Sequence, residues 1–207
     1  MCLDMAETFK KAIAAGFAIG IGAVIYISCE NKTVGALLFT VGLFAVCAFG
    51  MNLFTGKIGY VLANKNKPNC LLIWLGNLLG ASGGMALARI AKPSLHTAAR
   101  SMMEAKMSLS YAYVPILAFF CGALMYLAVE NYRANPHGFG KVTGLFLCVS
   151  VFILCGFEHS IADMCYAALA VESVSEALSY MAFLIVVSVF NSIGALTVRW
   201  LTVKKEG

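Results

Sequence analysis

Charged residues are scarce in this sequence. Only 12% of the 207 residues are Asp, Glu, Lys or Arg, whereas 61% are hydrophobic and the mean hydropathy is +0.85. A typical soluble domain has about 25% charged residues. The scarcity excludes an ordinary soluble protein. The formal net charge of +5 is spread between apolar stretches and forms no basic face of the kind that binds nucleic acid.

Patterns for metal binding and disulfide bonding are also missing. The sequence has three histidines, none at a spacing typical of a metal site, and its cysteines form no CxxC pair. The eight cysteines stand at positions 2, 29, 47, 70, 121, 148, 155 and 165. Most of them lie inside apolar runs, where cysteine packs as a small hydrophobic residue. We therefore expect no metal, no cofactor and no disulfide framework.

Long apolar runs make up most of the sequence. Charged residues separate six of them, and each is long enough for the roughly 30 Å of a bilayer core, which takes about 20 helical residues. The runs cover residues 11–29, 33–63, 70–91, 107–129, 140–169 and 176–203. They predict an all-α integral membrane protein with six transmembrane helices, of which the second and fifth are interrupted. The first run lacks a small-residue cleavage pattern, which favours a retained helix over a signal peptide.

Lysine and arginine predict the orientation of these helices, because cytoplasmic loops carry an excess of both. With the N-terminus inside, ten basic residues fall inside and five outside. The inner set is Lys10, Lys11, Lys57, Lys65, Lys67, Arg133, Lys141, Arg199, Lys204 and Lys205, and the outer set is Lys32, Arg89, Lys92, Arg100 and Lys106. We therefore expect both termini in the cytoplasm. The outer bases concentrate in the connection 89–106, which suggests a cationic vestibule that gathers anions.

The two halves of the sequence resemble each other. Residues 22–31 read GAVIYISCEN and residues 122–131 read GALMYLAVEN, so that five residue types recur 100 positions apart. NLLGA from Asn77 likewise returns as NSIGA from Asn191. The sequence therefore predicts two units of three helices each.

An odd number of helices per unit means that the second unit enters the membrane from the opposite side. This is the inverted-repeat plan of many transporters. We expect one transmembrane domain over residues 1–207, with repeat one at about 8–91 and repeat two at about 105–205.

The two long runs are interrupted at corresponding places. The second contains FGMNLFTGKIG (49–59) and the fifth contains CGFEHSIAD (155–163), which put glycines and polar residues inside apolar sequence. Irregular backbone at membrane depth is tolerated only where protein or a water-filled cavity satisfies its amides. Two broken helices at equivalent positions therefore predict a central pathway.

His159 stands at the midpoint of the second interruption. A neutral buried histidine held by a hydroxyl group is the structural alternative, but ionisable groups in membrane spans usually line pathways. We favour the pathway role, with Thr55 as the hydrogen-bond partner across the repeat axis. Imidazole is the side chain that normally changes charge near neutral pH, so His159 is also the candidate for proton exchange.

The polar neighbours of this pair have structural interpretations. Glu158 and Asp163 are expected to cap amides freed by the break, Asp163 as an acid near a helix N-terminus. Asn77 and Asn191 are expected to hold the broken segments by side-chain hydrogen bonds. Lys106, at the start of the fourth run, either snorkels to the headgroups or attracts anions at the pore mouth.

Other residues near the interruptions also receive structural roles. Asn52 lies inside the first interruption and is expected to support it. Sequence alone assigns a set of apolar residues to the core, namely Phe39, Leu43, Phe54 and Phe152.

Four motifs resemble those of the formate/nitrite transporter family. NLFTG (52–56), GNLLGA (76–81), GFEHSIADM (156–164) and FNSIGA (190–195) stand in the order and on the helices of that family. The stretch KMSL…FFCGALMYLAV, from Lys106, also has the family's spacing between the lysine and the fourth-helix motif. The resemblance covers essentially the whole chain.

The resemblance implies a homopentamer in the bacterial inner membrane. Each protomer would have an aquaporin-like six-helix fold and its own pore for small monovalent anions such as formate, nitrite or hydrosulfide, with protons taking part. Thr55 and His159 would form the central polar pair of this pore. By position, the apolar constrictions would be formed by Leu43 and Phe54 and by Phe39 and Phe152, and Lys106 would be the outer lysine.

Two positions depart from the family pattern. Gly122 stands where many members have asparagine, and Asp163 replaces an asparagine after the histidine. Both bear on the substrate, so hydrosulfide or a short-chain carboxylate such as acetate or lactate is the alternative to formate and nitrite. An intramembrane enzyme using His159 and Glu158 would lack a matched nucleophile, and a neutral-solute channel would lack paired Asn-Pro-Ala motifs. We expect a pH-dependent channel and not an enzyme.

Overall fold

The computed structural model describes residues 2–62, 67–110 and 112–202, and within these ranges it contains helices and no strand. Lys65, Lys204 and Lys205, which entered the orientation argument, lie outside the described residues. The helices are α1 (Cys2–Ser28), α2 (Lys32–Ala48), α3 (Phe54–Lys57), the 3₁₀ turn η1 (Ile58–Tyr60), α4 (Cys70–Ala91), α5 (Ser94–Met107), α6 (Tyr113–Ala134), α7 (Gly138–Leu154), α8 (Ser160–Ala170) and α9 (Val174–Thr202).

Four helices in the described ranges are long and apolar enough to cross a membrane. They span Asp4–Ser28 within α1, and the whole of α4, α6 and α9. The predicted second and fifth runs are each divided, since α2 and α7 have 17 residues each and α8 has 11. Length and composition thus give four continuous spans instead of the six expected, with the remaining apolar sequence in shorter helices.

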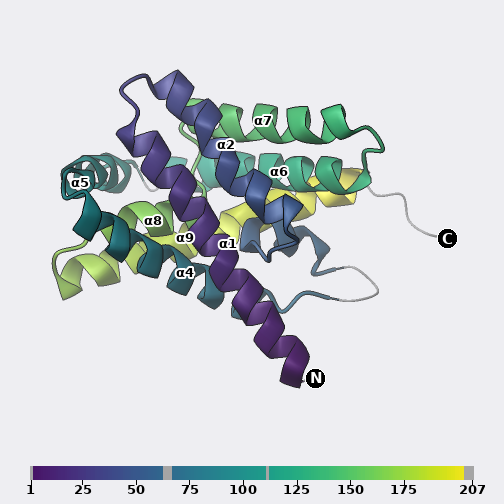
Figure 1. The fold of residues 1–207 in the computed structure, drawn as a ribbon, viewed down its shortest axis with the longest axis horizontal. Coiled ribbons are helices and arrows are strands. Elements are labelled where there is room, and N and C mark those ends of the chain that lie inside the picture. Colours follow the sequence, from purple (N-terminus) through teal and green to yellow (C-terminus); the bar gives the residue numbers. More distant parts are fainter. Residues whose placement is uncertain (1, 63–66, 111, 203–207) are drawn as a thin grey trace.

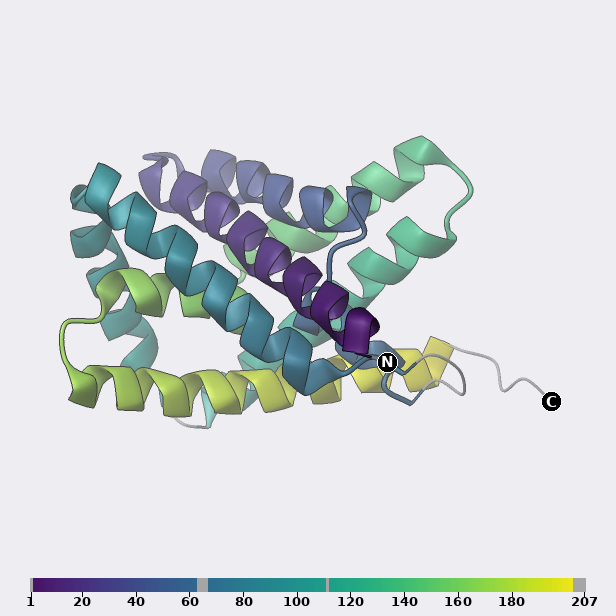
Figure 2. The same ribbon diagram turned by 60° about the horizontal axis from the view of Figure 1, so that its bottom comes forward.

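The long helices pack in two similar groups. α1 lies against α4 and α2, and α6 lies against α9 and α7, while α2 and α7 contact each other and connect the groups (Figure 1). α8 lies between these groups and α5. Figure 2 shows α1 and α4 side by side, with α9 running along the base of the molecule.

The connections gather at two opposite ends of the molecule. One end, here called the α5 end, carries α5 together with the α1–α2 and α8–α9 turns (Figures 1 and 2). The other, here called the α6–α7 end, carries residues 135–137, the start of α1 and the end of α9. Of the described bases assigned to the inner side, Lys57, Lys67, Arg133 and Arg199 lie together. Of the outer set, Lys92, Arg100 and Lys106 lie directly before α5 or within it.

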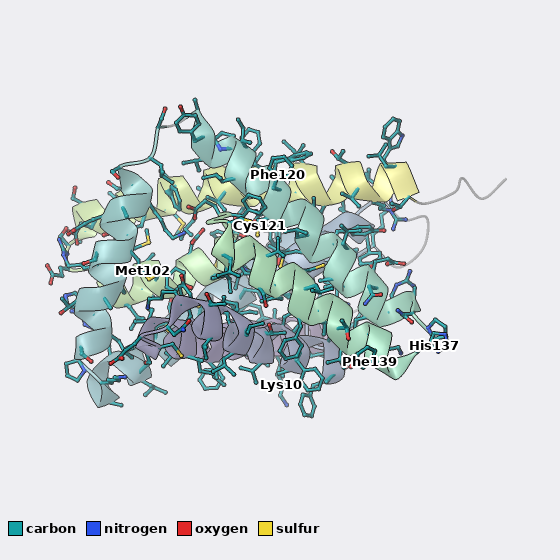
Figure 3. All side chains as sticks on the ribbon, turned by 90° about the horizontal axis from the view of Figure 1, so that it is seen from above. Lys10, Met102, Phe120, Cys121, His137 and Phe139 are labelled. Carbon is teal, nitrogen blue, oxygen red and sulfur yellow. The ribbon has the colours of Figure 1, made fainter. Side chains whose placement is uncertain are left out.

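Apolar side chains cover the outside of the bundle as well as its core. Phe120 on α6 is 48% exposed and Phe139 on α7 is 86% exposed, whereas Cys121 points into the bundle and is fully buried (Figure 3). Large apolar side chains are also exposed on α2, α4 and α9. This surface suits hydrocarbon and not water, because a soluble monomer rarely exposes such extended apolar patches.

The helix α5 was not expected, because residues 89–106 were predicted to form a connection. Its buried residues Leu95, Ala99 and Met103 recur every four positions, and the helix packs against α8. This spacing is the period of an amphipathic helix. The sequence contains this spacing, but the polar residues between Leu95, Ala99 and Met103 made the segment resemble a connection.

Both broken helices end in the same way. Gly50 follows α2 with φ of +60° and Gly156 follows α7 with φ of +67°, a conformation that costs glycine little. The bonds that close these ends run from Met51 N to Val46 O and from Phe157 N to Phe152 O, both 2.9 Å. This is the Schellman arrangement, which satisfies carbonyl groups at a helix C-terminus. Three extended residues then follow each glycine before the next helix begins.

The first extended segment is held by Asn77 of α4. Its Oδ1 accepts a hydrogen bond from the amide of Phe54 at 2.8 Å, and its Nδ2 donates to the carbonyl of Asn52 at 2.9 Å. Nδ2 also donates to the carbonyl of Ala12 on α1 at 2.7 Å. The side chain of Asn52 in turn donates to the carbonyl of Thr8 at 3.2 Å. The segment is thereby tied to α1 and α4.

The second extended segment is held by Asn191 of α9 through the same set of bonds. Its Oδ1 accepts from the amide of Ser160 at 3.0 Å, and its Nδ2 donates to the carbonyls of Glu158 and Ala118, each at 2.8 Å. Each asparagine therefore satisfies backbone groups that the break leaves without a helical partner, which buried peptide groups require.

Glycines let the long helices approach closely beside these asparagines. A Cβ at Gly16 would overlap the carbonyl of Asn77, and a Cβ at Gly122 would overlap that of Asn191. Gly122 thus corresponds to Gly16, 106 positions earlier, and Ala118 to Ala12. The repeat register of 100 positions, which paired Gly122 with Gly22, was wrong by six residues, because Gly22 instead faces the carbonyl of Phe39.

A pair of alanine substitutions on α4 tests this close packing. A Cβ at Gly80 would overlap the carbonyl of Ile13, whereas Gly83 has open space around it. Gly80→Ala should lower the free energy of unfolding by about 1–3 kcal/mol, since backbone must move to admit the methyl group. Gly83→Ala should be neutral or raise it by up to about 1 kcal/mol, because alanine favours helix. Thermal unfolding in detergent measures both, and equal effects would contradict the packing.

Candidate functional site

The site is built where the two broken helices meet. Thr55 lies in α3, just after the first extended segment, and His159 ends the second extended segment immediately before α8. Thr55 Oγ1 lies 2.9 Å from His159 Nε2, and the two side chains are 1% and 2% exposed. A polar pair is thus enclosed at the junction, with 104 positions between its members.

His159 also begins α8. Its Nδ1 accepts a hydrogen bond from the amide of Ala162 at 3.0 Å, so the imidazole is the N-cap of this helix. A ring nitrogen that accepts carries no hydrogen, and we therefore assign the neutral tautomer with its hydrogen on Nε2. Nε2–H is then directed at the Thr55 hydroxyl group. The ring presents one N–H at the centre of the site and no fixed charge.

Aromatic rings cover the histidine on one side. Phe152 of α7 stacks on the His159 ring with centroids 5.3 Å apart and an interplanar angle of 27°. Phe39 of α2 meets Phe152 edge to face, with centroids 5.9 Å apart. Leu43 and Phe54 are also buried and belong to the same apolar core. Phe152 thus contacts the central ring directly and Phe39 contacts Phe152, while Leu43 and Phe54 belong to the core around the pair.

Lys106 is placed differently from the expectation. It lies near the end of α5, before α6 begins, and it neither snorkels nor stands free at a pore mouth. Its ammonium group forms ion pairs with Glu158 and, at 3.0 Å, with Asp163. The Tyr166 ring lies 5.8 Å from Nζ as a further partner that the sequence gave no reason to expect.

Asp163 lies in the first turn of α8, as expected of an acid near a helix N-terminus. The expected hydrogen bonds from the amides of the break go to other groups than the two carboxyl groups. The amides there already have partners, because Asn191 accepts from Ser160 and His159 accepts from Ala162. Glu158 and Asp163 are instead 2% and 1% exposed and face Lys106. The buried ammonium group, not the helix terminus, takes up their charge.

The basic connection 89–106 is partly neutralised. Arg100 pairs with Glu172 and Glu176 at 2.9 and 3.1 Å, and the hydrogen bond that it donates to Glu176 raises the pKa of its guanidinium group. Arg89 donates to the carbonyl of Val171 at 3.1 Å, and Lys92 is exposed and contacts the hydroxyl group of Ser28. Cations near the C-terminus of α8 also complement its helix dipole. Arg100 is therefore balanced by carboxylates, whereas Arg89 and Lys92 contact neutral groups.

An open cavity with several bases lies at the α6–α7 end instead. Its volume is about 710 Å³. The charged residues that line it are Asp4, Lys57, Lys67, Arg133 and Arg199. Asn52 lines it as well, so the cavity reaches the extended segment that leads to Thr55. The sequence analysis missed this cavity because its bases come from four separate segments of the chain.

Metal chemistry has no counterpart in the described ranges. No three His, Cys, Asp or Glu side chains there are grouped so that they could hold a metal ion. The chemistry available at the junction is therefore hydrogen bonding by Thr55 and His159 within an apolar enclosure.

Sequence comparison relates the chain to known transport proteins. Residues 1–203 match the formate/nitrite transporter family. The formate channel FocB of Escherichia coli K12 is 26% identical over 186 residues, which cover 76% of this chain and 64% of that protein. A probable formate transporter of Methanothermobacter thermautotrophicus is 28% identical over 209 residues, covering 84% and 76%. The chain thus spans just under two thirds of the Escherichia coli relative.

Solved structures have the same fold. An ion channel of the formate/nitrite transporter family superposes with a TM-score of 0.84 at 22% identity, covering 96% of this chain and 91% of the other. A pentameric formate channel with formate bound superposes with a TM-score of 0.77 at 24% identity, covering 93% of each chain. The match over residues 1–203 shows that the chain belongs to the formate/nitrite transporter family, a family of transport proteins and not of enzymes.

Proposed function

We propose that this protein is a membrane channel for small monovalent anions of weak acids, of the formate or nitrite class. The observation that carries the proposal is the Thr55–His159 pair, which is the polar group enclosed by apolar side chains where the two broken helices meet. Hydrogen-bond donors at that position can bind a polar solute that has lost its hydrating water inside the apolar enclosure.

Electrostatics decides which form of the solute passes. Moving a bare anion into a medium of low dielectric constant costs of order 20 kcal/mol before relaxation, whereas a neutral acid incurs roughly a few kcal/mol. The enclosure formed by Leu43 and Phe54 and by Phe39 and Phe152 acts as two apolar constrictions. They reject the ion and pass its neutral acid, so flux depends on pH.

His159 supplies a hydrogen bond to the solute between the constrictions. Its Nε2–H and the Thr55 hydroxyl group turn from each other to the incoming oxygen, which stabilises negative charge there. The proton that neutralises the anion passes along water hydrogen-bonded to Nε2–H, because a neutral ring whose Nδ1 accepts from the Ala162 amide has no second proton to release. Nδ1 stays with the Ala162 amide throughout, so α8 keeps its cap.

The basic cavity at the α6–α7 end concentrates anions. Lys57, Lys67, Arg133 and Arg199 raise the local anion concentration, because a cleft lined by one sign of charge attracts the opposite sign. This gives the collecting role to the end opposite the one predicted from Lys106.

The membrane arrangement follows the same proposal. Residues 1–207 form one transmembrane domain with six crossings, the second made of α2 and α3 and the fifth of α7 and α8. Repeat one covers about 8–91 and repeat two about 105–205, inverted relative to each other. The matching bonds of Asn77 and Asn191 and the matching Schellman turns support this plan.

The assembly and its location also come under the proposal. Both termini face the cytoplasm of a bacterial inner membrane, with the bases of the α6–α7 end on that side. Five protomers associate through part of the exposed apolar surface, and lipid covers the rest. The pentameric formate channel of the same fold supports this stoichiometry.

Removal of one hydroxyl group tests the central pair. Thr55→Val keeps the shape of the side chain and removes the partner of Nε2, so flux of formate or nitrite into proteoliposomes should fall by about tenfold or more, the effect of one lost hydrogen bond. Thr40→Val is the matched control, because that hydroxyl group is buried and makes no hydrogen bond. Wild-type flux in Thr55→Val would remove the pair from the pathway.

Replacement of the imidazole tests the pH dependence. Asparagine is a favoured N-cap, so His159→Asn should still fold and assemble. Imidazole normally changes charge between about pH 5 and 8. We expect wild-type flux to rise as the pH falls through this range, and the variant to lose most of this rise. Stopped-flow measurement at constant anion gradient reports the profile. An unaltered profile would exclude proton exchange at His159.

Neutralising the basic cavity tests the collection of anions. Lys57→Gln combined with Lys67→Gln should lower flux about threefold at low substrate concentration and about 0.01 M salt, where the Debye length is about 30 Å. The difference should vanish near 0.15 M salt, where charges are screened within about 8 Å. Lys32→Gln, at the α5 end, is the control. A deficit that is independent of salt would contradict an electrostatic role.

A further inference from the structure

The cluster of Lys106, Glu158 and Asp163 contains more acid than base. One ammonium group contacts both carboxyl groups, and the Lys106 side chain is 17% exposed while those of Glu158 and Asp163 are 2% and 1% exposed. If both carboxyl groups were ionised, one negative charge would have no counterpart. An uncompensated buried charge is costly enough that such a group usually takes up a proton instead.

The neighbouring groups do not supply the missing charge. From α6 the cluster is faced by Cys121, and on α8 by Cys165 and Tyr166, which are neutral acids in their ordinary state. Tyr26 of α1 lies near Tyr166 and has no basic group to contribute. Arg89, His96 and Arg100 contact the other end of α8, at the carbonyls of residues 169–171.

The first turn of α8 does not supply it either. A helix N-terminus attracts negative charge through its free amides. Here the Ser160 amide donates to Asn191 and the Ala162 amide to His159. The amide of Asp163 donates to the carbonyl of His159. Asp163 Oδ2 is buried and has no hydrogen-bond partner among these groups.

The two carboxyl groups are held next to each other, because both contact the same Lys106 ammonium nitrogen. Two neighbouring carboxylates repel each other in a buried site, so that one of them tends to take up a proton. A protonated carboxyl group can also donate a hydrogen bond to the other, which a carboxylate cannot. This arrangement and the charge count point to the same state.

We propose that Glu158 and Asp163 share one proton at neutral pH, so that together with the Lys106 ammonium group they form an uncharged site beside His159. When the proton is released to water under alkaline conditions, the site becomes negative. The negative charge then lies next to the central pair, since Glu158 precedes His159 in the chain, and it slows the passage of anions. Asp163 is a positioning residue that sets the charge of the cluster. The inference rests on the proposed function only for its effect on flux.

The protonated carboxyl group is detected without any transport. Infrared spectra of the purified full chain, recorded in H₂O and D₂O at pH 7, should show the carbonyl stretch of a protonated buried carboxyl group, and alkaline pH should remove it. Asp163→Asn or Glu158→Gln should each abolish the band, because the remaining carboxylate is then balanced by Lys106. Glu30→Gln, which changes an exposed carboxyl group, should leave it unaltered.

The outcomes separate the inference from the channel proposal. Absence of the band from the wild-type protein, or its persistence in both Asp163→Asn and Glu158→Gln, would overturn the shared proton whether or not the protein conducts anions. If the band behaves as expected, wild-type formate flux should fall by about tenfold between about pH 7 and 9, the effect of one unit charge near the pathway at an effective dielectric constant of about 20. Over this range Asp163→Asn should lose the part of the fall that the cluster causes and keep only the smaller pH dependence that His159 contributes. An equal fall in the variant would overturn control by the cluster.

Discussion

The structure depends on satisfying the backbone where two apolar helices break. Peptide groups in an apolar interior need partners. Apart from the amides of Met51 and Phe157, which close the Schellman turns, the extended residues after Gly50 and Gly156 have none in the helix that precedes them. Asn77 and Asn191 provide them, each through one accepting oxygen and two donated N–H bonds. These bonds fix the positions from which Thr55 and His159 meet. Without them, the polar pair would have no defined geometry.

The same constraint explains the division of labour around His159. The two amides at the start of α8 are occupied by Asn191 and by the imidazole, so the carboxyl groups of Glu158 and Asp163 remain available for Lys106. The histidine is held by Ala162 on one nitrogen and meets Thr55 with the other. Its tautomer is therefore a result of the fold, and the residue contributes to helix capping and to the site at once.

The sequence was sufficient for much of this arrangement and insufficient for the electrostatics. Gly50 and Gly156 marked the breaks because each stands beside polar residues inside an apolar run, and the asparagine motifs marked the helix segments that face them. Long-range pairing could not be derived in the same way. Lys106 lies 52 positions from Glu158, and four segments contribute to the basic cavity, so the partners of these bases depend on the packed helices. The alignment of the two repeats was also wrong. It followed the identical residues at 22–31 and 122–131, whereas the contacts of the glycines with neighbouring helices, which depend on packing, indicate a different alignment.

Helix α5 holds α8 at both ends. Lys106 binds the acidic groups at its beginning, and His96 and Arg100 bind its last carbonyls at 2.8 and 3.5 Å. Two attachments on a helix of 11 residues restrict its tilt relative to α5. Because the central imidazole is joined to the first residue of α8, α5 also helps to set the position of the ring. The geometry of the central pair therefore depends on a helix that lies outside the four long apolar spans.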